Sequence, residues 1–242
     1  MLELNNVTKK FGGLVAVNGV SLKVREQEIL GLVGPNGAGK TTLFNLISGI
    51  YRPDKGSIEY QGQDISKLPM DKICRLGIAK TFQHTHSFPG MTARESVMLG
   101  SLFGNGHHTT MAEAASEASG ILARVGFPSE KTDKPLSSLN VIELRRTQLA
   151  RALASRPKVL LLDELMTGLN PSEGAEAMDL IRGLRDDGIT IVIIEHVMRV
   201  ILGVSDRVVV LDRGEKIADG KPEDVVRDQK VIDSYLGERY AC

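Results

Sequence analysis

The sequence predicts an α/β fold with a mixed, largely parallel sheet, an antiparallel β subdomain at the N-terminus and an inserted helical subdomain. Short apolar runs at Ile29–Val33, Val159–Leu162 and Ile189–Ile194 are typical of parallel strands that are buried on both faces. Near the N-terminus, Gly19–Val24 alternates apolar and polar residues, as a half-buried strand does. From His84 to Pro157 strand signals vanish and helical patterns dominate.

These patterns divide the chain into one nucleotide-binding core and one insertion. We expect a single domain, in which residues 1–86 and 157–242 form the core with its β subdomain. Residues 87–156 are expected to form the helical subdomain. At 242 residues, one core with an attached subdomain is the natural size.

In the first half of the chain, glycine-containing turns separate short strands and helices. Phe11-Gly12-Gly13 is expected to turn the chain between the first two strands. The predicted strands are Leu2–Lys10, Gly19–Val24, Ile29–Val33, Ser57–Tyr60 and Ile78–Gln83, and the predicted helices are Thr42–Gly49 and Lys72–Gly77.

After residue 86, three predicted helices precede a return to strands. The helices of the insertion are predicted at Thr92–Leu102, Met111–Val125 and Val141–Ser155. After them we expect strands at Val159–Glu164 and Ile189–Ile194, a helix at Pro171–Asp187, a hairpin of Arg207–Asp212 with Glu215–Ala218, and a helical segment at Pro222–Leu236.

Composition limits the class of partner. The 30 basic and 30 acidic side chains leave a formal charge of zero, which argues against nucleic acid as a partner. Cys74 and Cys242 offer no zinc spacing and suggest a reducing compartment. The apolar runs are far shorter than the roughly 18 residues of a membrane span, and Met1–Asn6 does not read as a signal peptide. We therefore expect a soluble, cytoplasmic protein unless a partner holds it at a membrane.

A phosphate-binding loop lies between the strand Ile29–Val33 and the following helix. The residues that form it are Gly34, Pro35, Asn36, Gly37, Ala38, Gly39, Lys40, Thr41 and Thr42, which satisfy the pattern G-x-x-x-x-G-K-[ST]. The glycines let backbone N–H groups close around phosphate oxygens, and the helix start adds a positive dipole end. Lys40 is expected to reach the β- and γ-phosphates, and the Thr41 hydroxyl is expected to bind Mg²⁺.

Other polar and aromatic residues follow strands at positions where ligands bind in α/β sheets. Asp163 is expected in the Mg²⁺ shell and Glu164 is expected to polarise the attacking water, since both end a buried run. Position in the sequence alone leaves two interpretations open for Phe11 and for Gln83. Phe11 suits either stacking on adenine or packing at a strand end, and Gln83 suits either a Mg²⁺ ligand or an exposed amide. His196, which follows another strand, could contact the γ-phosphate.

The order of these pieces resembles the ATPase subunit of an ATP-binding-cassette (ABC) transporter over essentially the whole chain. The resemblance implies a P-loop NTPase core that binds ATP and Mg²⁺, with Glu164 as general base and His196 as a switch beside the catalytic Lys40. It implies Mg²⁺ contacts from Thr41, Gln83 and Asp163, and an adenine platform at Phe11 with Val17 nearby.

Several segments are similar to the ATPases of branched-chain amino-acid importers. They include Phe11–Val17, Gly34–Ser48, Ala79–Gln83, Phe88–Thr92 and Val231–Glu238. The family resemblance implies a dimer of ATPases at the inner face of the cell membrane, under two transmembrane permease subunits, with a periplasmic binding protein that delivers the substrate. Phe88–Glu95 is then expected to be part of the surface that receives the permease.

One motif departs from the family pattern. The slot of the LSGGQ-like signature, counted back from Ala150–Leu153, holds Leu139, Asn140, Val141, Ile142 and Glu143. In the family this signature completes the ATP site of the partner ATPase. Val141 and Ile142 add β-branched side chains where close backbone approach is needed, and Glu143 adds negative charge. The sequence therefore predicts a dimer with a second, different ATPase, with one good and one impaired site. The alternative is that Asn140–Glu143 adopt the usual geometry through backbone groups and work normally.

Two smaller departures from the family pattern concern loops. Leu165 replaces the usual proline after the glutamate, and Asn170 replaces an aspartate of the dimer loop.

Other functions compete with import. A lipid-export ATPase is the nearest alternative. A soluble cassette protein would show tandem cassettes, a coiled-coil insertion or a basic face, and a non-hydrolysing subunit would lack Glu164 or Lys40.

Overall fold

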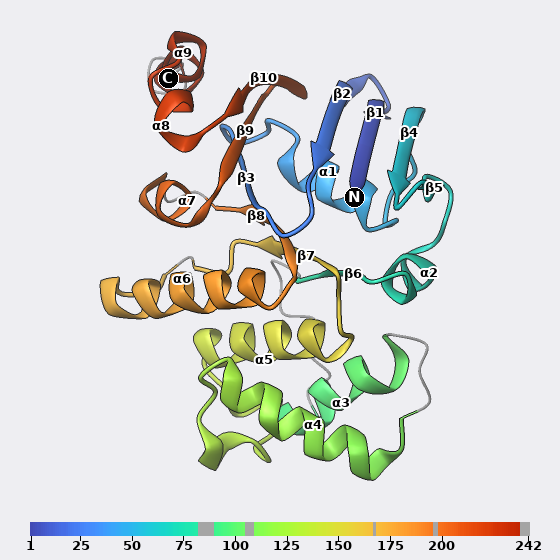
Figure 1. Ribbon diagram of the computed structural model, residues 1–242, viewed down its shortest axis with the longest axis vertical. Helices are drawn as coiled ribbons and strands as arrows, with labels where there is room; N and C mark the ends of the chain where they lie inside the picture. Colours follow the sequence, from blue (N-terminus) through green and yellow to red (C-terminus); the bar gives the residue numbers. More distant parts are fainter. Residues whose placement is uncertain (82–89, 105–108, 167, 196–197, 238–242) are drawn as a thin grey trace. The chain divides into compact units, whose positions relative to one another are not determined.

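The structure, a computed structural model, describes residues 1–81, 90–104, 109–166, 168–195 and 198–237 (Figure 1). The chain divides into two compact units. The first comprises Met1–Met70 with Met166–Cys242, and the second comprises Asp71–Leu165. The domain boundaries predicted at 86/87 and 156/157 stay a prediction.

The first unit contains an antiparallel sheet built from the N-terminal strands. β1 (Leu2–Phe11) pairs with β2 (Leu14–Val24) on one side and with β4 (Lys55–Tyr60) on the other, and β5 (Gln63–Asp64) pairs with β4. β2 begins earlier than the alternation predicts, because the hairpin keeps pairing up to Phe11 and Leu14. The turn uses Gly12 at φ 57°, a conformation that favours glycine.

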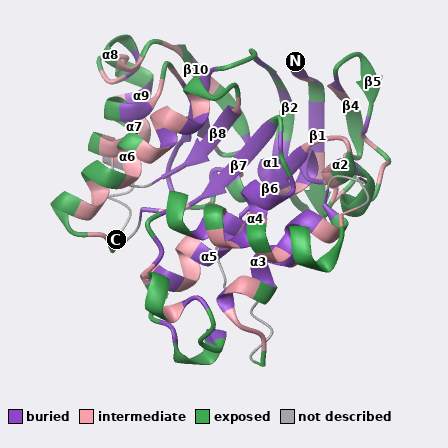
Figure 2. Cartoon of the chain, turned by 60° about the horizontal axis from the view of Figure 1, so that its bottom comes forward, coloured by how far each residue is buried: buried purple, intermediate pink, exposed green. Residues whose placement is uncertain are grey.

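The second sheet of this unit contains β10, β9, β3 and β8 in that order. β3 (Ile29–Val33) pairs in parallel with β8 (Thr190–Ile194) and with β9 (Arg207–Asp212), while β10 (Glu215–Gly220) pairs antiparallel with β9. All residues of β3 and β8 are buried, as the apolar runs predict. Figure 2 shows β8 in the colour of buried residues.

Five helices accompany these sheets among the described residues of the first unit. They are α1 (Lys40–Ile47), α6 (Pro171–Asp186), α7 (Met198–Val204), α8 (Pro222–Val225) and α9 (Gln229–Gly237). The C-terminal segment predicted as one helical stretch is split into α8 and α9, and α7 was not predicted.

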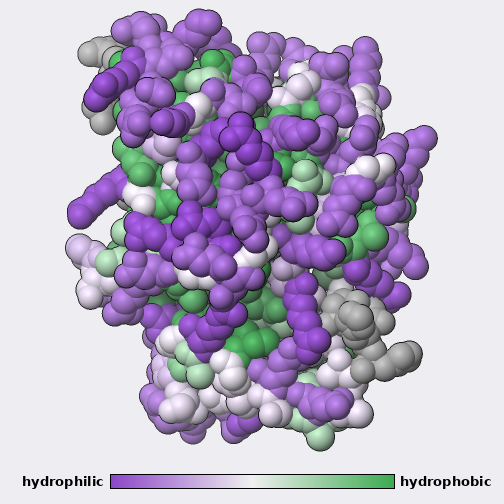
Figure 3. Space-filling model, viewed as in Figure 1, coloured by the Kyte–Doolittle hydropathy of each residue, from purple (hydrophilic) through white to green (hydrophobic). Residues whose placement is uncertain are grey.

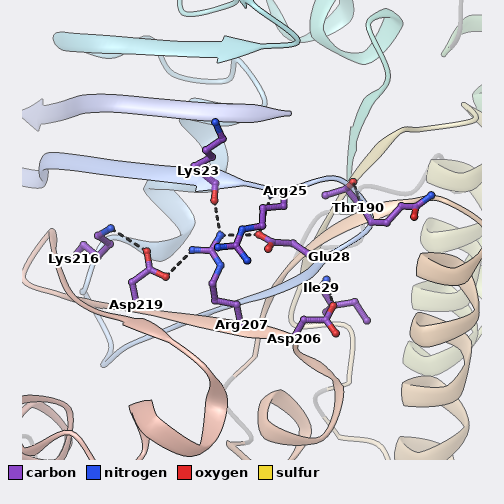
Figure 4. Close-up of polar contacts among 10 residues, drawn as sticks. Lys23, Arg25, Glu28, Ile29, Thr190, Asp206, Arg207, Lys216 and Asp219 are labelled. Carbon is purple, nitrogen blue, oxygen red and sulfur yellow. Dashed lines mark hydrogen bonds and ion pairs between the residues drawn. The ribbon is translucent and has the colours of Figure 1, made fainter.

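A partly buried ion-pair cluster joins the two sheets of the first unit (Figure 4). The Arg207 guanidinium on β9 contacts Glu28 at 2.7 Å and Asp219 on β10 at 2.6 Å, and it donates to the Lys23 carbonyl at the end of β2. Because each partner comes from a different segment, the cluster fixes β2 relative to β9 and β10.

The second unit combines two parallel strands with the helices of the insertion. β6 (Ile78–Lys80) pairs with β7 (Val159–Asp163). The helices are α2 (Met70–Arg75), α3 (Ala93–Phe103), α4 (Met111–Arg124) and α5 (Val141–Ala154), with short 3-10 turns at Ser129–Lys131 and Leu136–Ser138. α3 and α5 approach closely, since a Cβ on Gly100 would lie 2.2 Å from the Arg151 carbonyl oxygen.

The visible surface in Figure 3 is mainly hydrophilic, with small separated apolar patches. Among the described residues, we find no helix with the length and apolarity that a membrane crossing requires.

Candidate functional site

The loop between β3 and α1 has a backbone that favours glycine at three positions. Gly34, Gly37 and Gly39 have φ values of 147°, 77° and 97°. A Cβ on Gly34 would lie 2.0 Å from the Leu211 carbonyl oxygen, and one on Gly39 would lie 2.3 Å from the Ala16 carbonyl oxygen. The loop is therefore wedged between β9 and β2, and its conformation is set by these close approaches.

Hydrogen bonds join the same loop to the turn between β9 and β10. The Gly214 N–H donates to the Ala38 carbonyl at 3.1 Å, and the Asn18 N–H donates to the Gly214 carbonyl at 2.8 Å. Gly39 is the N-cap of α1, so no capping side chain covers the helix start. The first amide groups of a helix lack intrahelical partners, so this end is suited to an anion.

The Lys40 ammonium lies over the loop from which it extends. Its Nζ donates to the carbonyl oxygens of Gly34 at 2.5 Å and Pro35 at 2.7 Å, and the residue is only 6% exposed. Thr41 is exposed and Thr42 is half-buried. The arrangement places a cation and a hydroxyl at the helix start, which are the groups that a phosphate and its metal ion require.

Phe11 and Val17 lie on the two strands of the N-terminal hairpin. Phe11 ends β1 and is 41% exposed, whereas Val17 is buried and pairs with Lys9 of β1. Ala16, the neighbour of Val17, is the residue whose carbonyl meets Gly39. The hairpin that carries Phe11 thus packs directly on the phosphate-binding loop.

In the second unit, Asp163 ends the buried strand β7 beside a buried lysine. The Asp163 side chain is 1% exposed, and its Oδ2 lies 3.5 Å from Lys80 Nζ on β6. The Asp163 N–H donates to Thr81 Oγ1 at 3.1 Å. Burial lowers the pKa of Lys80, and the Asp163 charge opposes that shift. A buried carboxylate at a strand end is an oxygen donor of the kind that Mg²⁺ prefers.

Glu164 follows Asp163 in an unusual conformation, with φ 53°. This left-handed region is uncommon for residues other than glycine, so the turn holds Glu164 against a local preference. Gln83 and His196 lie outside the described residues. Glu195, just before His196, is buried and accepts a hydrogen bond from the Met166 N–H at 2.6 Å.

The segment 139–143 forms the start of α5, and it builds a complete capping box. Asn140 is the N-cap and its Oδ1 accepts from the Glu143 N–H at 2.9 Å, while Glu143 accepts from the Asn140 N–H at 3.1 Å. Lys131 Nζ lies 2.7 Å from the Glu143 carboxylate and holds its pKa below the usual value. The Glu143 charge is therefore compensated locally, which the sequence pattern did not predict.

The flanking residues of this segment differ in exposure. Val141 is 60% exposed at the first position of the helix, Ile142 is half-buried and Leu139 is buried. An exposed β-branched residue thus lies at the position where the family resemblance predicts a signature glycine.

Sequence reasoning missed Lys80 and Lys131 as partners of predicted site residues. Lys80 carried a signal, because a lysine inside a short apolar strand must find a counter-charge when it is buried. Lys131 carried none, since it is 12 residues from Glu143 and only the fold of the intervening turn brings the two together.

Comparison with known proteins gives consistent matches. The family model described as "ABC transporter" matches residues 17–167, and the model described as "Branched-chain amino acid ATP-binding cassette transporter" matches residues 215–241. LivG of Salmonella typhimurium, named a high-affinity branched-chain amino acid transport ATP-binding protein, is 39% identical over 98% of each chain. BraF of Pseudomonas aeruginosa, which has the same description, is 40% identical over 98% of each chain.

Solved structures match over the same extent. The ADP conformation of MJ1267, an ATP-binding cassette of an ABC transporter, superposes with a TM-score of 0.87 at 29% identity over 98% of each chain. A nucleotide-free ATP-binding cassette from an ABC transporter superposes with a TM-score of 0.87 at 27% identity, covering 97% of this chain and 98% of that one.

Proposed function

Since this chain belongs to the ABC transporter family, we propose that it is the ATP-binding and ATP-hydrolysing subunit of an importer for branched-chain or related amino acids. The observation that carries the proposal is the wedged loop 34–39 with the Lys40 ammonium held above it. Identities of 39–40% with LivG and BraF over nearly whole chains support the amino-acid substrate class.

The described residues of the phosphate-binding loop suit the phosphates of the nucleotide. Cβ atoms on Gly34 and Gly39 would have no room, and the helix start has no capping side chain, so both features fit the phosphates. Lys40 would hold the β- and γ-phosphates. Phe11 and Val17 would lie beside the adenine base of the nucleotide. Mg²⁺, when bound, would neutralise phosphate charge and would be held by Thr41, Gln83 and Asp163.

Glu164 is proposed as the general base of hydrolysis. It would accept the proton of the attacking water, and the conformation at φ 53° would set the direction in which its side chain leaves the backbone. His196 is proposed to contact the γ-phosphate and Gln83 to orient water, as the family resemblance implies.

The proposed assembly has a second ATPase, two transmembrane permease subunits and, indirectly, a periplasmic substrate-binding protein. Because the described helices include none that could cross a membrane, the permeases would supply the membrane spans. The chain would then be cytoplasmic and peripheral on the inner face of the membrane. Import is favoured over lipid export or a soluble role by the match of residues 215–241 to the branched-chain model.

The second ATPase is proposed to be a different chain. Val141 and Ile142 add side chains at the start of α5, so this signature would complete a partner's ATP site poorly. Because Lys131 pairs with Glu143, the Glu143 charge would repel a partner's phosphate less than the sequence alone suggests. The side chains of Val141 and Ile142 would still obstruct the close approach.

The proposed function is tested by Glu164→Gln in the assembled transporter. The amide keeps the shape of the side chain but cannot accept the proton, so the assembly should bind Mg-ATP, stop hydrolysis in this subunit's site and accumulate in an ATP-bound form. Glu130→Gln, at an exposed position, is the matched control and should retain activity. Hydrolysis at the original rate in the Glu164→Gln assembly would assign the base elsewhere. Permease subunits that copurify with the chain would identify the transport class.

A further inference from the structure

The loop that follows α1 is attached to the end of β1 that carries Phe11. The Asp54 N–H donates to the Thr8 carbonyl at 2.8 Å. The Asp54 carboxylate accepts from the Lys10 N–H at 2.6 Å and from Lys9 Nζ at 3.0 Å. Three contacts through Asp54 therefore hold the Tyr51–Asp54 loop against the last residues of β1.

Phe11 is contacted by an aromatic ring from the loop and a cation from its own strand. The Tyr51 ring makes an edge contact with the Phe11 ring, with centroids 5.1 Å apart and an interplanar angle of 72°. Lys9 Nζ lies over the Phe11 ring at 5.6 Å from the centroid. The Lys9 side chain is only 15% exposed, since it is also paired with Asp54, whereas Phe11 keeps 41% of its surface open.

The loop is also tied to the helix that begins at the phosphate-binding loop. The Tyr51 N–H donates to the Asn45 carbonyl of α1 at 3.0 Å. α1 begins at Lys40 and has 8 residues, which corresponds to a length of about 12 Å. One short helix thus links the cation over the phosphate loop to the ring that contacts Phe11.

We propose that Tyr51 is a positioning residue for the base of the bound nucleotide, because the contact between its ring and the Phe11 ring sets the orientation of Phe11. This inference rests on the proposed function, in which Phe11 stacks on the purine. A half-exposed phenylalanine at the end of a hairpin has open rotamers, and stacking on a base requires one of them. The contacts with Tyr51 and Lys9 select a rotamer and leave part of the ring accessible, so the orientation is set before the base arrives.

The test uses two ligands to separate the contribution of the adenine base to affinity from that of the phosphates. Mg-ATP carries both, and Mg-tripolyphosphate carries only the phosphate part. Affinities of the purified full chain for each are measured by titration calorimetry. Tyr51→Leu, which removes the ring but stays apolar, should weaken Mg-ATP binding about three- to tenfold. Its affinity for Mg-tripolyphosphate should stay within about twofold, because the phosphate loop is untouched.

Two further variants complete the design. Phe11→Ala removes the platform itself and should show the same ligand selectivity as Tyr51→Leu with a loss at least as large. Tyr51→Phe keeps the aromatic ring and should retain the Mg-ATP affinity of the unmodified chain.

The proposal is overturned if Tyr51→Leu binds Mg-ATP as tightly as the unmodified chain. It is also overturned if the affinities for the two ligands fall by the same factor, because Tyr51 would then support the fold as a whole. If the unmodified chain binds neither ligand, the proposed function fails. If the unmodified chain binds Mg-ATP and Mg-tripolyphosphate equally well, the adenine base contributes nothing to affinity. The proposed role of Tyr51 then fails, while the phosphate-binding function stands.

Discussion

At the residue scale, Glu164 combines a charged side chain with a backbone conformation that favours glycine, φ 53°. Glu164→Gly and Glu164→Ala both remove the proposed base, so both should abolish hydrolysis. They should differ in stability, because alanine keeps the Cβ that disfavours this conformation. We expect Glu164→Gly to be more stable than Glu164→Ala by about 1 kcal/mol in denaturant unfolding. Equal stabilities would mean that the turn relaxes in the variants.

The glycines of the phosphate-binding loop differ in what surrounds them. A Cβ on Gly34 would meet the Leu211 carbonyl oxygen at 2.0 Å, whereas one on Gly37 would have nothing within 4 Å. Gly37→Ala should therefore lower the unfolding free energy only because alanine disfavours the positive φ at this position, by about 1 kcal/mol. Gly34→Ala must also displace β9 or the loop, which should add roughly 1–3 kcal/mol. Thermal unfolding of the two variants side by side measures the difference, and a smaller cost for Gly34→Ala would contradict the geometry.

At the scale of single elements, the start of α5 depends on its capping box. Asn140→Ala removes the side-chain acceptor of the Glu143 N–H and should cost about 1 kcal/mol of unfolding free energy. Asn140→Ser retains an acceptor and should stay close to the unmodified chain. Equal losses in the two variants would show that the helix start is held by other contacts.

The Glu143–Lys131 pair adds a pH dependence to the same element. The ammonium of Lys131 holds the pKa of Glu143 below its usual value, so the pair stabilises the folded chain above the pKa of an unfolded glutamate. That contribution is lost as pH falls through the folded pKa, in the range below about 4.3. The stability difference between the unmodified chain and Glu143→Gln should be constant from pH 6 to 7 and shrink under acid, as measured by urea unfolding across pH. A difference that grew toward low pH would reverse the sign and refute the pairing.

At the scale of the whole molecule, the prediction concerns assembly. A chain whose signature is Leu139–Glu143 should dimerise weakly with itself and turn over ATP slowly alone, because Val141 and Ile142 obstruct close approach to a partner's phosphates. Replacing 139–143 with LSGGQ should raise ATP-dependent self-dimerisation and turnover, measured by sedimentation and phosphate release. The same replacement placed on Glu164→Gln should dimerise without turnover, which separates assembly from chemistry. Fast turnover by a homodimer, unaffected by the replacement, would contradict the prediction.

Much of the molecule follows from short-range patterns in the sequence. Ile29–Val33, Val159–Asp163 and Thr190–Ile194 are strands because short runs of mainly β-branched and leucine residues suit positions buried on both faces. The phosphate-binding loop was predicted because its glycines and lysine have a fixed spacing. The family followed from the order of such motifs along the chain, and the comparisons confirm it.

Contacts between segments far apart in the chain were decided only by the tertiary structure. The contacts of Phe11 with Tyr51, of Asp163 with Lys80 and of Gly39 with Ala16 each join different elements, so no local pattern predicts them. The splitting of the C-terminal helical segment into α8 and α9 was likewise missed, because helical periodicity marks apolar faces but not the contacts that end a helix. The sequence by itself determined which chemical groups the protein has and which strands are buried. The tertiary structure decided which side chains support those groups, because burial forces each charge and each ring to find a partner wherever the fold places one.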